Sequence, residues 1–309
     1  MIYDLAIIGG GPAGVSAGVY AARKKIKTVF ITQDFVNQST VSDNIQNWIG
    51  TISISGEKLA EDLEKHLRAY AGDSLDLQIG EKALDLKKNS DSTFTLKTNK
   101  AEYQAKTVLI TTGSVRKKIT VPGAAEFENK GITYCATCDG PLFGDMDVVV
   151  IGGGNSAFES ALQLAAYTKS VTILQRSAFK ADKITQQKAF ADPKIKGFEN
   201  IDLIEIKGDK FVTAVVYKDR ASGETKELPV TGVFVEIGAN PSVDYVKNGI
   251  IKLNEVEQIV TDPRTQATSE KGIWSAGDCT DGLYKQNNIA AGDAIKAVEN
   301  IYMYLKAEM

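Results

Sequence analysis

Residues 4–11 read Asp-Leu-Ala-Ile-Ile-Gly-Gly-Gly, and the pattern returns 143 residues later, where residues 147–154 read Asp-Val-Val-Val-Ile-Gly-Gly-Gly. In each copy a short apolar run, typical of a buried parallel strand, ends in a glycine-rich turn. A helix is expected next, over about Pro12–Lys24 and Asn155–Tyr167, and then a second apolar strand, at Thr28–Ile31 in the first copy. The chain therefore contains one strand–helix–strand unit twice.

The glycines of both copies have the spacing of a dinucleotide-binding turn. The first copy reads Gly9-x-Gly11-x-x-Gly14 and the second reads Gly152-x-Gly154-x-x-Ala157. Small residues at these places let the backbone approach a pyrophosphate and let the helix pack closely on the strand, and the helix amides then face the phosphates. One such turn also closes ordinary parallel-sheet units, but two copies with matched strands favour dinucleotide binding.

The two copies differ where a ribose would be recognised. Asp34 lies twenty residues after the last glycine of the first motif, and its carboxylate can accept from a ribose 2′-hydroxyl, which suits FAD or NAD. The second copy has Ser177 at the matching position, with Arg176, Lys180 and Lys183 around it. Positive charge there favours a 2′-phosphate, although such residues are equally typical of a solvated surface loop.

Two connections divide the chain into domains. Residues 114–131 are rich in loop formers, and Gly-Ala-Asn-Pro-Ser at residues 238–242 is the second connection. The sequence therefore predicts an α/β protein with two dinucleotide-binding, Rossmann-like domains, the second inserted in the first. The first domain comprises residues 1–114 and 243–309, and the central domain comprises residues 115–242. Alternating short runs over residues 73–111 predict an antiparallel meander inserted in the first domain.

Composition excludes several classes of protein. Of the 309 residues, 43% are hydrophobic and 24% are charged, with a net charge of −3, so neither disorder nor nucleic-acid binding is favoured. No apolar run has the length of a membrane span, and the N-terminus lacks the basic region of a signal peptide, which predicts a cytoplasmic protein. With a single histidine, His66, neither a Ser-His-Asp triad nor a multi-histidine metal site is expected, and no metal is expected.

The candidate reactive element is Cys135-Ala-Thr-Cys138 with Asp139 directly after it. Two cysteines three residues apart on a first helical turn can bring their Cα atoms within the roughly 4.4–6.8 Å that a disulfide needs. No second cysteine pair or nearby histidine completes a zinc site, which favours a redox pair over a metal clip or two unpaired thiols. Asp139 can move the protons that thiol exchange requires. Cys279 has no partner in the sequence and is expected in the core.

These motifs resemble the low-molecular-weight thioredoxin reductase family of FAD flavoproteins, and the resemblance covers nearly the whole chain. The Cys-Ala-Thr-Cys-Asp-Gly hexapeptide at residues 135–140 is highly specific in this setting. The other features that occur in the family's order are Gly9–Gly14, Asn47-Trp48, Thr112-Gly113, Val121-Pro122-Gly123, Gly152–Ala157, and Gly277-Asp278 followed by Tyr284-Lys285-Gln286.

The resemblance implies a thioredoxin-disulfide reductase that binds FAD in its first domain. Cys138 would be the thiol nearest the flavin, Cys135 would attack the disulfide of thioredoxin, and Asp139 would donate the proton. The family pattern further implies a homodimer, and a central domain that rotates about the two connections. Together with Asp34, the implied cofactor-binding residues are Gly9, Gly11, Pro12, Ala13, Gly14, Gln38, Asn47, Thr112, Gly113, Gly277, Asp278, Lys285 and Gln286.

The second nucleotide site departs from the family pattern. Where NADPH-using members carry His-Arg-Arg and then another arginine, this chain has Gln-Arg-Ser at residues 175–177 and then Lys180, with one residue fewer. Each charge-assisted hydrogen bond to a 2′-phosphate contributes about 1.5–3 kcal/mol, so the loss of two weakens NADPH binding roughly 10²- to 10⁴-fold. The candidate residues of this site are Gly152, Gly154, Asn155, Ser156, Ala157, Arg176 and Lys180.

The expected electron donor is therefore reduced ferredoxin, as in the sister branch of ferredoxin-dependent flavin thioredoxin reductases, whose nucleotide site is eroded. NADPH is the alternative donor, and NADH, a deazaflavin donor and reversed use as a dithiol oxidase stay open. A different class, a non-catalytic FAD-binding redox sensor, has no need of the exchangeable pair Cys135 and Cys138.

The segment Gly140–Gly144 is short, apolar and bounded by turn formers, so an exposed loop tip is expected there. Leu142 and Phe143 would then form a docking patch for thioredoxin. A buried turn is the alternative interpretation.

Overall fold

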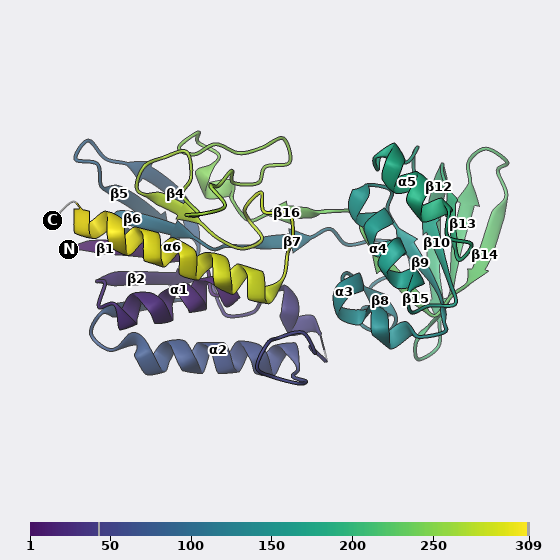
Figure 1. Ribbon diagram of the computed structural model, residues 1–309, viewed down its shortest axis with the longest axis horizontal. Helices are drawn as coiled ribbons and strands as arrows, with labels where there is room; N and C mark the ends of the chain where they lie inside the picture. Colours follow the sequence, from purple (N-terminus) through teal and green to yellow (C-terminus); the bar gives the residue numbers. More distant parts are fainter. Residues whose placement is uncertain (43, 308–309) are drawn as a thin grey trace. The chain divides into compact units, whose positions relative to one another are not determined.

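The computed structural model describes residues 1–42 and 44–307. The chain divides into two compact units, each an α/β fold built on a largely parallel sheet. Unit 1 comprises Met1–Val115 and Asn240–Met309, and unit 2 comprises Arg116–Ala239. The second unit is inserted in the first, and the predicted fold class is confirmed (Figure 1). The two chain crossings pair with each other as the short strands β7 (Ser114–Arg116) and β16 (Ala239–Pro241).

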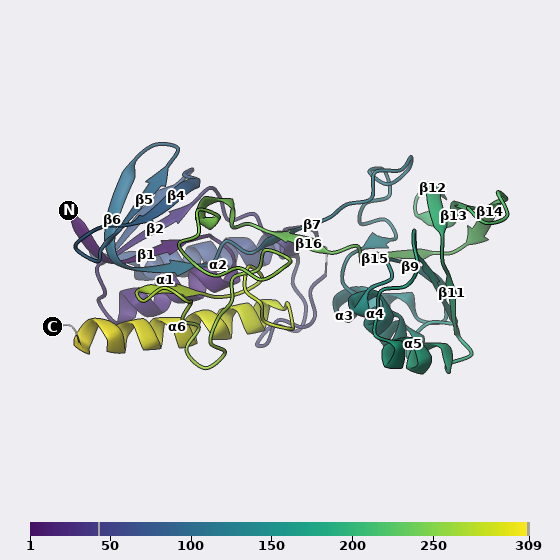
Figure 2. The same ribbon diagram turned by 90° about the horizontal axis from the view of Figure 1, so that it is seen from above.

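Unit 1 has a seven-stranded sheet in the order β3-β2-β1-β6-β5-β4, with β17 paired to β6. Figures 1 and 2 show α1 and α6 side by side along this sheet. The bounds of the remaining elements are β1 (Ile2–Ile8), α1 (Pro12–Arg23), β2 (Thr28–Thr32), η1 (Gln38–Val41), α2 (Gly56–Ala71), β3 (Leu75–Ile79), β4 (Ala83–Lys88), β5 (Phe94–Thr98), β6 (Glu102–Ile110), η3 (Asp244–Val246), β17 (Ile273–Ser275) and α6 (Asn287–Ala307).

The side chains of β1 point alternately to the two faces of this sheet and contribute to the core on both. Leu5 and Ile7 pack toward the helices, and Ala6 and Ile8 pack toward the opposite face, with all four side chains buried. This is the period of two that a strand imposes on its side chains. Because both faces of the strand are buried, its sequence is an unbroken apolar run that ends where the turn begins.

Unit 2 repeats this plan with a five-stranded sheet in the order β11-β10-β9-β15-β8, to which the three-stranded sheet β12-β13-β14 is added. The helices α4 and α5 cover one face and the added sheet covers the other. The bounds are β8 (Ile132–Thr133), α3 (Ala136–Asp139), η2 (Gly140–Phe143), β9 (Asp147–Ile151), α4 (Asn155–Ala165), β10 (Ser170–Leu174), α5 (Lys183–Phe190), β11 (Ile195–Phe198), β12 (Ile201–Gly208), β13 (Val212–Asp219), β14 (Thr225–Pro229) and β15 (Gly232–Val235).

The meander is shorter than predicted. Strands β4, β5 and β6 are antiparallel neighbours, but Leu75–Ile79 pairs in parallel with β2, from Thr28 opposite Leu75 to Thr32 opposite Ile79. The prediction for residues 73–79 was wrong because α2 intervenes between β2 and β3. A helical crossover returns the chain in the direction in which it left, so the next strand joins the sheet in parallel.

Among the described residues, no helix combines the length and the hydrophobicity that crossing a bilayer requires.

Candidate active site

In the first glycine turn, Gly9 and Gly14 lie against neighbouring backbone atoms, whereas Gly11 faces open space. Gly9 has a φ of +118°, and a Cβ there would lie 2.4 Å from the Thr111 carbonyl oxygen. At Gly14 a Cβ would lie 1.8 Å from the Gly9 carbonyl oxygen, so only glycine lets α1 approach β1 this closely. At Gly11 a Cβ would meet no atom within 4 Å. The open side at Gly11 is the space that a pyrophosphate needs.

The carboxyl ends of three strands meet at this turn. The Thr111 N–H donates to the Ile8 carbonyl at 2.8 Å, which sets the end of β6 beside the end of β1. The Ala276 N–H donates to the Ile110 carbonyl at 2.9 Å, which brings the end of β17 to the same place. As a result Pro12, Ala13, Thr112, Gly113, Gly277 and Asp278 lie at one edge of the sheet, which is where open α/β sheets bind their ligands.

Side-chain hydrogen bonds bring further predicted residues to this edge. Gln38 Nε2 donates to the Ser114 carbonyl at 2.6 Å and lies 3.4 Å from Asp278 Oδ2. Asn47 Nδ2 donates to Gln286 Oε1 at 3.2 Å. The pairs Gln38–Asp278 and Asn47–Gln286 each join positions that lie about 240 residues apart in the sequence. Four of the predicted cofactor residues thus form two contacts that no local motif contains.

The side chains of two other predicted residues, Asp34 and Lys285, form hydrogen bonds only with backbone groups close to them in the sequence among the contacts described. Asp34 is exposed after β2, and its Oδ1 accepts from the Val36 N–H at 3.0 Å. Lys285 donates from Nζ to the Thr280 carbonyl at 2.6 Å, and burial lowers the pKa of its ammonium group.

The second glycine turn has the same open side. Gly152 has a φ of +144°, with a would-be Cβ 2.2 Å from the Glu236 carbonyl oxygen, and Ala157 is fully buried under the turn. A Cβ at Gly154 would meet no atom within 4 Å. Asn155 and Ser156, which begin α4, are exposed. The backbone of unit 2 therefore fits a dinucleotide as well as the backbone of unit 1 does.

The chain after β10 folds back onto this second turn. The Lys180 N–H donates to the Gly153 carbonyl at 2.7 Å, and the side chain of Gln175 lies against Gly153. Asn155 and Asp182 are joined by two hydrogen bonds, of 3.0 and 2.8 Å. This segment is thereby held by backbone and amide contacts rather than by the charges of its basic residues.

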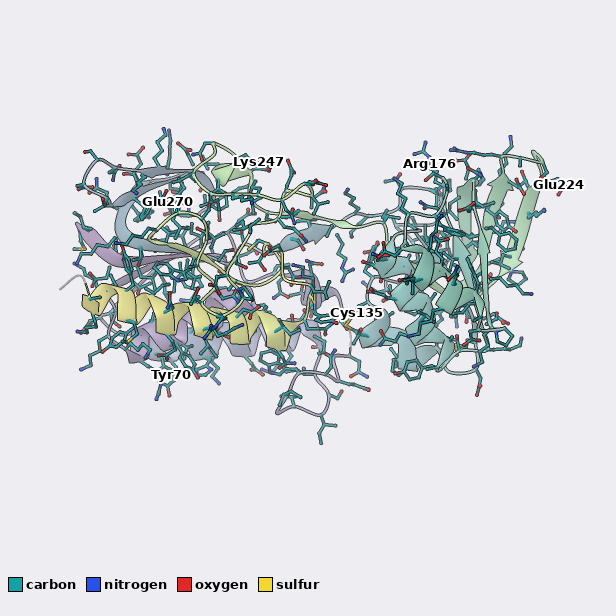
Figure 3. All side chains as sticks on the ribbon, turned by 45° about the horizontal axis from the view of Figure 1, so that its top comes forward. Tyr70, Cys135, Arg176, Glu224, Lys247 and Glu270 are labelled. Carbon is teal, nitrogen blue, oxygen red and sulfur yellow. A yellow bond between two sulfur atoms is a disulfide. The ribbon has the colours of Figure 1, made fainter. Side chains whose placement is uncertain are left out.

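The basic residues expected near a 2′-phosphate are exposed. Arg176 is 82% exposed and lies 4.0 Å from Asp202, a carboxylate that Arg220 already binds through two hydrogen bonds. Figure 3 shows Arg176 at the outer edge of unit 2, well separated from Cys135. Lys180 is also exposed. The environment of Ser177 thus resembles a solvated loop more than an anion site.

Cys135 and Cys138 form a disulfide, with their Cα atoms 5.3 Å apart. Cys135 is the residue before the short helix α3, and its Sγ accepts from the Cys138 N–H at 3.1 Å. Both residues are partly exposed. A hydrogen bond to sulfur at this place favours the thiolate of Cys135 once the disulfide is opened, because it stabilises the charged form.

Asp139 is held by a residue that the sequence did not indicate. The Thr133 hydroxyl, at the end of β8, donates to Asp139 Oδ2 and also accepts from the Cys135 N–H at 3.4 Å. Burial raises the pKa of the Asp139 carboxyl, and the Thr133 hydrogen bond opposes that rise. A carboxyl with a raised pKa beside a redox pair suits proton transfer near neutral pH. Thr133 gives no signal in the sequence, since it belongs to a strand of two residues.

The segment after the cysteines is neither wholly exposed nor wholly buried. Leu142 is 53% exposed, as expected for a loop tip. Phe143 is partly buried and packs against the core of unit 2, with its ring centroid 5.1 Å from that of Phe234, so the exposed loop tip expected for this segment is seen at Leu142 and not at Phe143. Gly232 leaves the room for this ring, since a Cβ there would lie 2.6 Å from it. Cys279 is a free, fully buried thiol, as predicted.

Two Rossmann-like units in one chain, the second with a disulfide beside a carboxyl group, are typical of flavoprotein disulfide oxidoreductases. Residues 3–294 match the model of the Pyridine nucleotide-disulphide oxidoreductase family, and the chain belongs to that family. Membership implies FAD as the resident flavin, and the open side of the first glycine turn fits it.

The known proteins that resemble this chain are of two kinds: longer proteins that it covers in part, and proteins of similar length that it covers almost completely. An NADH dehydrogenase of Bacillus subtilis is 39% identical over 304 residues, which cover 98% of this chain and 58% of the relative. An alkyl hydroperoxide reductase protein of Pseudomonas aeruginosa is 38% identical, with the same two shares. The chain thus spans less than two thirds of these relatives. A solved thioredoxin reductase from Streptococcus pyogenes is 33% identical, covers 99% of both chains and superposes with a TM-score of 0.89.

Proposed function

We propose that this chain is an FAD-dependent thioredoxin reductase that passes electrons through Cys135 and Cys138 to the disulfide of a thioredoxin-type protein. The observation that carries the proposal is the Cys135–Cys138 disulfide with Asp139 and Thr133 against it. The full-length likeness to the thioredoxin reductase of Streptococcus pyogenes supports it. The curated relatives have other names, so the identity of the partner protein belongs to the proposal.

FAD would lie on unit 1, with its pyrophosphate at the open side of Gly11 and its other contacts from the joined pairs Gln38–Asp278 and Asn47–Gln286. Bound FAD supplies the two electrons that open the disulfide. Cys135, as a thiolate, then attacks the partner's disulfide and forms a mixed disulfide with it. Cys138 attacks Cys135 in turn, which releases the reduced partner and restores the internal disulfide. Asp139 gives and takes the protons of these exchanges.

The electron donor is the open part of the proposal. The departure from the family pattern at residues 175–177 argues against NADPH, because two of the expected charges are absent and the remaining Arg176 and Lys180 are exposed. Reduced ferredoxin, the donor expected from the sequence, finds no support among the relatives. The name of the Bacillus subtilis relative favours NADH instead. We therefore propose a donor other than NADPH, with NADH and reduced ferredoxin as the two candidates.

One experiment tests the function and the donor together. The purified flavoprotein is mixed under anaerobic conditions with NADPH, NADH or photoreduced ferredoxin, and bleaching of the flavin is followed. Oxidised thioredoxin is then added. Recovery of the flavin colour is the expected result, with two dithiols formed in thioredoxin for each fully bleached flavin, because the Cys135–Cys138 pair holds a second electron pair. Rapid bleaching by micromolar NADPH would contradict the proposal on the donor, and bleaching without recovery would contradict thioredoxin as the partner.

Thr133→Val is expected to move the acidic limb of the pH profile of partner reduction to higher pH. The Thr133 hydroxyl binds the ionised form of Asp139, so its loss raises the pKa of a carboxyl that burial already raises. Asp139→Asn should lower the rate about 10²- to 10⁴-fold and remove this limb. Thr133→Ser keeps the hydroxyl and should retain the wild-type profile. An unmoved limb in Thr133→Val would assign it to another group.

Leu142→Ser is expected to raise the KM for thioredoxin about three- to tenfold, since roughly 1 kcal/mol of apolar contact is lost from a side chain that is 53% exposed. Reduction of the flavin by its donor should not change. Phe143→Ser is the contrasting variant. It should lower the free energy of unfolding of unit 2 by about 3 kcal/mol because the ring packs on Phe234. An unchanged KM in Leu142→Ser would place the docking surface elsewhere.

A further inference from the structure

Glu236 lies at the point where the strand order of unit 2 reverses. From β9 the chain passes through α4 to β10 on one side, while β15 pairs with β9 on the other. Glu236 directly follows β15, and its N–H donates to the Ile151 carbonyl at 2.8 Å. Its own carbonyl packs on Gly152 of the glycine turn. In open α/β sheets a dinucleotide lies across the crevice at this reversal.

The side chain of Glu236 is nearly enclosed and held in place. It is 10% exposed, its Oε1 accepts from the Ser160 hydroxyl of α4 at 2.8 Å, and its Oε2 lies 3.9 Å from Arg116. Burial raises the pKa of the carboxyl, while Ser160 and Arg116 lower it and Glu159 raises it further. Enclosing a carboxyl group with one neutral hydrogen bond and a distant cation costs stability. Stability of the fold alone therefore does not account for an acid at this position.

The position of Glu236 assigns it to one end of a bound dinucleotide. In this fold the ribose of the adenosine is recognised just after the second strand of the strand–helix–strand unit. In unit 2 that strand is β10, and the segment after it runs from Gln175 to Lys180. The pyrophosphate lies at the glycine turn. The other nucleoside must then extend across the reversal, over the end of β15 and Glu236.

We propose that Glu236 makes the nicotinamide end of unit 2 negatively charged, so that the unit binds oxidised NAD⁺ more tightly than NADH. The nicotinamide ring is neutral when reduced and carries one positive charge after it has given up its hydride. A carboxylate close to the ring stabilises the charged form selectively. This inference rests on the proposed function only in taking a pyridine dinucleotide as the donor.

Binding of NAD⁺ and of 1,4,5,6-tetrahydro-NAD, a redox-inert analogue whose nicotinamide ring is uncharged, to the oxidised flavoprotein tests the proposal by calorimetry. Wild-type protein should prefer NAD⁺, and Glu236→Gln should reduce that preference by roughly three- to tenfold, a value set by partial screening from Arg116. Glu224→Gln is the matched control, since it removes the same charge from unit 2. Figure 3 shows Glu224 on the side of this unit opposite Cys135. The control should keep the wild-type preference.

The dependence on pH separates an electrostatic role from a structural one. In the wild type the preference for NAD⁺ should grow as pH rises through the pKa of Glu236, and it should be flat in Glu236→Gln. Ser160→Ala keeps the carboxyl but removes the hydrogen bond to its ionised form, so it should move this rise to higher pH. Ser160→Ala also serves as the test if Glu236→Gln does not fold.

Three results would overturn the inference. They are a preference unchanged in Glu236→Gln, a preference lost equally in Glu224→Gln, and the absence of binding of either nucleotide to the wild type. The last result leaves the proposed reductase function intact if photoreduced ferredoxin still drives reduction of thioredoxin. Failure of thioredoxin reduction with every donor, alongside normal selectivity for NAD⁺, would instead contradict the proposed function alone.

Discussion

Cys138→Ser is expected to abolish reduction of the partner disulfide while FAD stays bound. The electron pair from the flavin can be stored only by converting the Cys135–Cys138 disulfide to two thiols, and a single thiol cannot store it. FAD would be held by unit 1, whereas both cysteines belong to unit 2. The measurements are the flavin absorbance of the purified variant and its rate of thioredoxin reduction.

The two cysteine variants should differ in what they trap. In Cys138→Ser the remaining Cys135 thiolate should form a mixed disulfide with oxidised thioredoxin, and alkylation of the thiol released on thioredoxin should trap this adduct for mass spectrometry. In Cys135→Ser no such adduct should form, because the sulfur that the Cys138 N–H stabilises is gone. Trapping by Cys135→Ser alone would reverse the assignment of roles and leave the rest of the mechanism in place.

Cys279→Ala is the control for both variants. Cys279 is the free cysteine of the described chain and is fully buried, with its thiol 3.3 Å from the Ser275 hydroxyl. Burial raises the pKa of this thiol, which keeps it protonated and unreactive. Normal turnover is expected in Cys279→Ala. Normal turnover in either single variant of the disulfide pair would remove the central claim of the proposed mechanism.

The repeated strand and turn were enough to predict the architecture because the physical constraint is local. A strand buried on both faces must be apolar at every position, and the turn after it must have glycine where backbone approaches backbone. Gly9 and Gly152 meet these constraints in the same way, with positive φ and a neighbouring carbonyl oxygen. Residues 75–79 were assigned wrongly because alternation marks a strand but does not give its direction. The preceding helix α2 decides that direction, because it returns the chain to the same end of the sheet.

The candidate site could be predicted only where its residues belong to motifs. The cysteine pair and the glycine turns are continuous in sequence, and the contact between Gln38 and Asp278 could be anticipated only through resemblance. Sequence reasoning did not single out Thr133 or Glu236, because each contacts its partner on another element. Glu236 had one usable signal. It follows a fully apolar run at the carboxyl end of a parallel strand, where polar side chains meet ligands.

Gly11→Ala is expected to lower the affinity for FAD about 10- to 100-fold without changing the fold. Gly11 has an extended backbone with a φ of −76°, which any residue can adopt, and a Cβ there would meet no protein atom within 4 Å. A methyl group forced against a tightly placed pyrophosphate costs about 1–3 kcal/mol. Thermal unfolding of the protein without FAD should match the wild type, and titration with FAD should show the loss.

Gly14→Ala and Gly154→Ala separate the possible causes of such a loss. Gly14→Ala places its methyl group 1.8 Å from the Gly9 carbonyl oxygen, so it should lower the thermal stability of the protein even without FAD. Gly154→Ala repeats the open geometry of Gly11 in unit 2, with a φ of −88° and no atom within 4 Å of the new methyl group. It should leave FAD binding unchanged and weaken only binding of a pyridine dinucleotide. Loss of FAD from Gly154→Ala, with FAD retained by Gly11→Ala, would exchange the roles proposed for the two units.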